Sequence, residues 1–209
     1  METWQELSSA VENHLADASI GERCIFAAGV AERLMRRHEG LPEEDQEPFT
    51  LSLRPLLDSV WEGALGDSTA FTHIKRGVGE FLLSDYCHND GQDGPDEADE
   101  STAAAVLHAA ETYLYGCADF ATWVSERAVQ AVDQHLEYLA DQSDDGILDD
   151  PDEAVTSELL RQLRDLELIA GYGKELRQSS RGLSIDTSAR LRAELRAPLS
   201  RQDLDTADQ

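Results

Sequence analysis

An alanine-rich run from Ser101 to Tyr138 places the strongest constraint on what this chain can fold into. Apolar residues recur along it at the three- and four-residue spacing of an amphipathic helix, and Gly116 divides the run in two. Alanine side chains are small enough to let neighbouring helices approach closely. The run therefore predicts two long antiparallel helices, Ser101–Tyr115 and Asp119–Tyr138, that form a central hairpin.

The second helix of this hairpin has the clearest apolar pattern in the chain. Its predicted core set includes Phe120, Trp123, Val124 and Leu136. If Trp123 lies in the core, its replacement by alanine should lower the free energy of unfolding by about 3–5 kcal/mol.

The same helical period recurs through the rest of the sequence, without the period-two alternation that is typical of strands. Further helices are predicted at Trp4–Ala18, Glu22–Arg37, from Pro55, at Thr69–Leu83, from Pro151, and at Ser184–Arg196. On the second of these, we expect Glu32, Arg33, Arg36 and Arg37 to face solvent. The predicted fold class is all-α: a single-domain bundle of about seven or eight helices around the central Ala-rich hairpin. It spans residues 1–198, and a frayed polar tail follows at 199–209.

The charge balance is extreme, with 43 acidic against 17 basic side chains and a formal net charge of −26. Such a chain repels nucleic acid and anionic membranes, so the charge favours a basic protein as partner, a toxin being one candidate. Solubility alone would explain the acidity equally well. The first residues do not have the pattern of an export signal, and the apolar runs are too short to predict a membrane span. The three widely spaced cysteines indicate neither a disulfide framework nor a zinc site. We expect a cytoplasmic protein.

Two acidic segments, expected to be loops, are the candidate partner-binding surface. The first extends from Asp85 to Glu100 and the second from Asp141 to Asp150. The candidate residues are Asp85, Asp90, Asp93, Asp96, Glu97, Asp99, Glu100, Asp144, Asp145, Asp149 and Asp150.

The second segment also resembles a calcium-binding EF-hand loop. Oxygen-bearing side chains stand at loop positions one, three, five, nine and twelve, which are Asp141, Ser143, Asp145, Asp149 and Asp152. Against a calcium site, position twelve has Asp instead of the longer Glu, and Pro151 interrupts the loop. An ordinary acidic connection between helices is the alternative.

The sequence contains no phosphate-binding glycine loop, no nucleophile elbow and no zinc-protease motif. We therefore predict no enzymatic activity and no cofactor. The alternatives are a metal-dependent or carboxylate enzyme that uses the acidic loops, and an acidic adaptor subunit of a larger assembly.

Three stretches resemble a bacterial all-helical family, domain-of-unknown-function family 416, and related small immunity proteins encoded beside toxins. They are IFAAGVAERL at 25–34, LLDSVWE at 56–62, and the pair DES at 99–101 with SERAVQAVD at 125–133. The resemblance covers about residues 20–140, and the family's Pro-Asn-Tyr stretch after the first motif is replaced here by residues 35–42. The resemblance implies an all-helical fold and an immunity or antitoxin function that neutralises a partner toxin, with no catalytic residue carried over.

Overall fold

The computed structural model describes residues 3–87, 98–142 and 151–202, with side chains described except at 98–100 and 137–142. These residues form an all-α, single-domain bundle without a strand, which confirms the predicted fold class. The longer helices are α1 (Trp4–Asp17), α2 (Ile20–Glu39), α4 (Arg54–Ala64), α5 (Ala70–Leu82), α6 (Ala98–Tyr115), α7 (Ala118–Gln142) and α8 (Pro151–Ala170). The shorter elements are η1 (Glu43–Asp45), α3 (Pro48–Ser52), α9 (Gly173–Leu176), η2 (Ser179–Arg181), α10 (Ile185–Leu191), η3 (Arg192–Arg196) and α11 (Ala197–Leu199).

Local signals account for the helix starts. The hydroxyls of Thr3 and Ser19 accept hydrogen bonds from the backbone N–H groups of Glu6 and Glu22. In return, the carboxylates of Glu6 and Glu22 accept hydrogen bonds from the backbone N–H groups of Thr3 and Ser19, which completes two capping boxes. Pro55 lies in the first turn of α4, where proline costs no hydrogen bond. Helices α1 and α2 therefore begin where a capping side chain satisfies a free N–H group.

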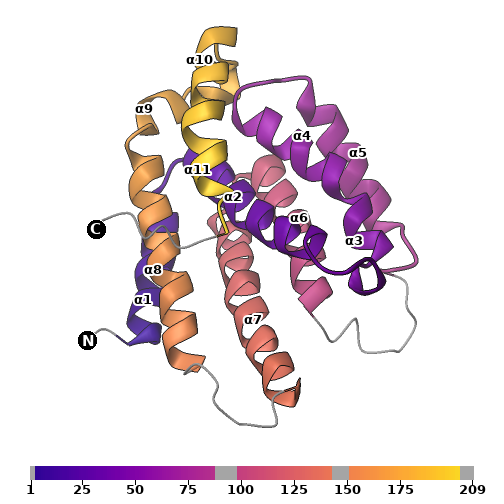
Figure 1. Ribbon diagram of the computed structural model, residues 1–209. Coiled ribbons are helices and arrows are strands. Elements are labelled where there is room, and N and C mark those ends of the chain that lie inside the picture. Colours follow the sequence, from indigo (N-terminus) through magenta and orange to yellow (C-terminus); the bar gives the residue numbers. More distant parts are fainter. Residues whose placement is uncertain (1–2, 88–97, 143–150, 203–209) are drawn as a thin grey trace.

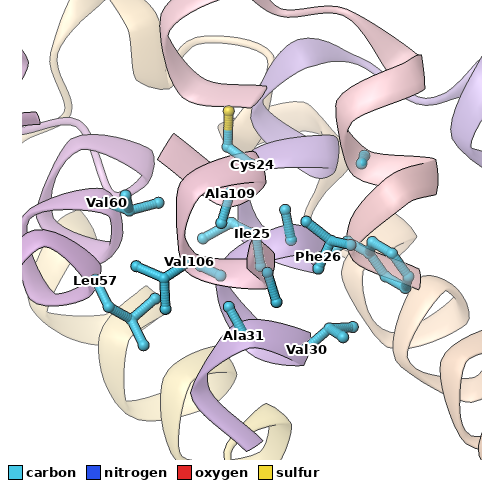
Figure 2. Packing of buried hydrophobic residues seen from close by; sticks show 14 of the residues in the cluster. Cys24, Ile25, Phe26, Val30, Ala31, Leu57, Val60, Val106 and Ala109 are labelled. Atoms are coloured by element: carbon cyan, nitrogen blue, oxygen red, sulfur yellow. The ribbon is translucent and has the colours of Figure 1, made fainter. Parts of the chain in front are cut away.

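The α6–α7 hairpin is present as predicted, and α2 passes through the middle of the molecule beside it (Figure 1). Figure 1 shows α1 and α8 on one side of α2 and α4 and α5 on the other. Ile25 of α2 lies near Val106 and Ala109 of α6, with Leu57 and Val60 of α4 next to them (Figure 2). The alanines of α6 bring its backbone close to α2, and the core forms around that contact.

Three predictions about burial are wrong. Glu32 and Arg33 do not face solvent, since their side chains are only 2% and 7% exposed. Trp123 is 42% exposed instead of lying in the core, so a cost of 3–5 kcal/mol on its replacement no longer follows. The tail begins later than predicted, because Leu199 and Ser200 are buried at the end of α11. Residues 203–209 lie outside the described part of the chain.

One close helix contact makes a direct test of this packing. Near the start of α2, a Cβ added to Gly21 would lie 2.1 Å from the carbonyl oxygen of Leu176 in α9, and a backbone oxygen cannot rotate away. We expect Gly21→Ala to lower the free energy of unfolding by about 2 kcal/mol, as measured by denaturant titration.

Gly79→Ala is the matched control, because a Cβ at position 79 would have no neighbour within 4 Å. This second change should stabilise α5 by about 1 kcal/mol through helix propensity. Equal effects of the two substitutions would show that α2 and α9 do not pack as described.

Candidate functional site

The first cluster of charged side chains is buried and centres on Glu32. Its carboxylate accepts hydrogen bonds from Arg36 Nε at 3.0 Å, Arg54 Nη1 at 2.8 Å and Trp61 Nε1 at 3.2 Å. The guanidinium of Arg196 lies 3.6 Å away and also stacks over the Trp61 ring. One carboxylate thus joins α2 to α4 and to the C-terminal helical stretch.

The pKa of Glu32 reflects two opposing effects. Burial raises it, but the hydrogen bond from Arg36 and the charges of Arg54 and Arg196 outweigh burial, so the pKa lies below the ordinary 4.5. Glu32 is therefore held as a carboxylate. Its lone pairs are directed at fixed donors and are not available to take a proton from a substrate.

Arg33, the next residue on α2, forms the centre of a second cluster on an adjacent face of the helix. It donates to Asp165 at 2.6 Å and to Glu158 at 3.3 Å, both on α8, and to the Leu199 carbonyl at 3.1 Å. Burial raises the pKa of Asp165 more than the charge of Arg33 lowers it. The three partners leave Arg33 no free donor face toward solvent, which is typical of a structural ion pair.

The polar contacts continue from α8 into α7. Gln162 donates to Glu158 at 3.0 Å and accepts a hydrogen bond from Ser125. Two adjacent networks of polar contacts therefore cross-link α2, α4, α7 and α8. They include four residues of the stretches that resemble family 416, which are Glu32, Arg33, Trp61 and Ser125. Their chemistry is that of scaffold contacts.

We expect Glu32→Gln to destabilise the protein by about 2 kcal/mol at neutral pH, because the neutral amide replaces a buried carboxylate that accepts charged hydrogen bonds from Arg36 and Arg54. A lowered folded pKa means that the charge of Glu32 stabilises the fold fully above pH 4.5 and loses this effect as pH falls through the lower folded value. The difference in stability between wild type and variant should therefore shrink below that pH, as measured by denaturant titration across the acid range.

Glu80→Gln is the control for this experiment, since Glu80 pairs with Arg76 on an exposed helix face. Its substitution should change little at any pH. A Glu32→Gln penalty that stays constant into acid would contradict the described role of the carboxylate.

Most predicted partner-binding residues lie outside the described residues. They are Asp90, Asp93, Asp96, Glu97, Asp144, Asp145, Asp149 and Asp150, and Ser143 of the calcium-loop candidate also lies outside. Asp99 and Glu100 lie in the first turn of α6 and Asp141 near the end of α7, with the backbone alone described. Asp85 follows α5 and is exposed, and Asp152 is exposed in the first turn of α8.

The described residues therefore do not test whether the predicted loop residues come together, and the calcium site stays a prediction. Within residues 3–87, 101–136 and 151–202, no group of three or more His, Cys, Asp or Glu side chains is placed to hold a metal ion.

A surface feature that the sequence reasoning missed lies on α7. Asp119, Trp123, Glu126, Gln130 and Asp133 follow each other at helical spacing, and all five are exposed. We call this set the α7 stripe. This pattern is visible in the sequence, but the apolar character of Trp123 predicts a core residue. The structure instead leaves Trp123 exposed, about 100° around the helix from the buried Val124.

Many of the arginines, by contrast, are engaged inside the molecule. Arg23 donates to the carbonyls of Leu15, Ala16 and Gly116. Arg192 pairs with Glu62, and Arg196 pairs with Asp58. Because these basic side chains make internal contacts, they neutralise fewer of the exposed acids, such as those of the α7 stripe, and the surface carries an excess of negative charge.

The described residues also contain a groove of about 370 Å³ between α4 and α5. Arg76 and Glu80 on its rim are paired with each other at 2.8 Å, and its inner wall includes Leu53, Leu56 and Phe81. This groove has no unpaired charged group pointing to a particular ligand.

Comparisons of the chain with protein families, curated proteins and solved structures found no match. No helix in the described parts of the chain is both long enough and apolar enough to cross a membrane.

Proposed function

We propose that this chain is an immunity or antitoxin-like binding protein that neutralises a basic partner toxin through its acidic surface, in the cytoplasm. The observation that carries the proposal is the use of charge: Arg33, Arg54 and Arg196 cross-link helices, while the acids of the α7 stripe are exposed. A surface of this kind is poorly suited to phosphate or to anionic lipid.

The electrostatics favour fast association with a cationic protein. A net charge of −26 attracts such a partner over a distance set by the ionic strength, which raises the association rate more than the final affinity. A nuclease with a basic groove for phosphates would be complementary to this surface. Neutralisation would follow if the acidic surface occupied that groove.

The resemblance to domain-of-unknown-function family 416 and to toxin-immunity proteins supports the same function. Residues of the resembling motifs, including Glu32, Arg33 and Trp61, hold the helices together and leave the surface to determine the partner. A binding protein needs such a scaffold and does not need an active site.

The test is co-expression with the protein encoded by the neighbouring reading frame. We expect this chain to restore the growth of cells that produce that protein, and the two to purify together, with the complex dissociating as salt is raised. No rescue together with no co-purification would refute the proposed function.

A pair of charge reversals locates the contact. Glu126→Lys with Asp133→Lys alters two exposed acids of the α7 stripe, whereas Glu43→Lys with Glu44→Lys makes the same charge change on exposed η1. The first pair should slow association by about tenfold or more at low salt, and the second should have a smaller effect. Equal slowing would place the contact elsewhere on the acidic surface.

A further inference from the structure

The turn between α6 and α7 carries a cluster of aromatic rings at the surface. We define the aromatic cluster as His108, Tyr115, Phe120 and Trp123. The Phe120 ring lies 5.1 Å from that of Trp123 and 5.7 Å from that of Tyr115, measured between centroids. His108 lies 5.3 Å from Trp123, so the four rings form one continuous group.

Two of these rings are open to solvent to an unusual degree. Tyr115 is 66% exposed and Trp123 is 42% exposed. Ile20, at the start of α2, is also exposed and contacts the turn, since a Cβ on Gly116 would lie 2.9 Å from its Cδ1. Contiguous exposed apolar side chains are typical of interaction sites.

Acidic groups border the aromatic cluster. Asp119 and Glu126 flank Trp123 on the α7 stripe, and the Glu111 carboxylate lies 2.9 Å from the His108 ring. Arg23, near the turn, is directed inward onto three backbone carbonyls at 2.6–3.0 Å, and Arg127, one turn after Trp123 on α7, donates to Gln130 at 2.7 Å. Carboxylates therefore border the rings at Asp119, Glu126 and Glu111, and Arg23 does not cover them.

We propose that the aromatic cluster is the anchor for the protein partner, and that the partner inserts arginine side chains there. This inference rests on the proposed function and names the contact within it. A guanidinium can stack on a tryptophan or tyrosine face while its N–H groups bind carboxylates at the edge. Aromatic rings and arginine are also the groups most enriched among interface residues that dominate binding energy.

A second copy of this chain is the other occupant to consider. Two copies meeting at this face would bring Asp119 and Glu126 against their own equivalents, in a chain with a net charge of −26. Like charges facing each other oppose such a contact. A basic partner meets no such penalty, and its cations are complementary to both the rings and the carboxylates.

Binding of synthetic peptides to the full-length chain tests this inference. One peptide carries arginines spaced by glycine and serine, and its counterpart has a lysine in place of each arginine. Trp123→Ala is compared with Trp4→Ala, which removes a tryptophan of nearly equal exposure, 39%, from α1. Circular dichroism melts show whether each variant is folded, and affinities are measured by calorimetry at low and raised salt.

We expect wild type to bind the arginine peptide more tightly than the lysine peptide. The affinity for the arginine peptide should fall about tenfold in Trp123→Ala and stay unchanged in Trp4→Ala. Unchanged binding to a folded Trp123→Ala variant would overturn the anchor and leave the proposed function standing. If neither peptide binds wild type at low salt, the anchor is overturned, whereas the proposed function is decided by rescue and co-purification with the neighbouring protein. A dimer of the chain in sedimentation that Trp123→Ala abolishes would overturn the basic partner in favour of a second copy.

Discussion

The buried charges of α2 are the interaction on which the rest of the bundle depends. Glu32 and Arg33 are neighbours in sequence and point about 100° apart around the helix. Glu32 binds Arg54 of α4, Arg33 binds Asp165 of α8, and both also contact the C-terminal stretch. Removing two such charges from water is costly, and the cost is offset only if their partners are fixed at hydrogen-bonding distance. Each helix that supplies a partner is therefore held in one position relative to α2, which apolar packing alone would specify less strictly.

This arrangement explains why an acidic protein keeps its few cations where it does. Arginine can serve two carboxylates and a carbonyl at once, as Arg33 does, because its donors are spread over a planar group. Only two lysines accompany the arginines in the sequence, at positions 75 and 174, and both lie on exposed helix surfaces. Arginines such as Arg33, Arg54 and Arg196 thus cross-link helices, while many acids lie at the surface.

The fold could be predicted from sequence because helical period and capping are local. Leu7, Val11 and Leu15 recur at the spacing of one helix face, and all three are buried as that spacing requires. The burial of Arg33 could not be predicted in this way, since its partner Asp165 is 132 residues away and no local pattern records it. The exposure of Trp123 follows from its neighbours and not from its own apolar side chain. Polar residues precede and follow it at helical spacing, and that pattern predicts an exposed helix face. The acidic loops, where most of the candidate site was placed, fall largely in residues that the structure does not describe.

Arg23 fixes the position of the α6–α7 turn relative to α1. Its guanidinium holds the last carbonyls of α1 and the carbonyl of Gly116 together, while Gly116 itself adopts a left-handed conformation with φ of 68°. The rings on either side of the turn are thereby fixed before any partner arrives. A preorganised surface loses little conformational entropy when it forms a complex, so the ordering cost would fall on the other molecule. Single substitutions in such a surface are expected to change the dissociation rate of the complex more than its association rate.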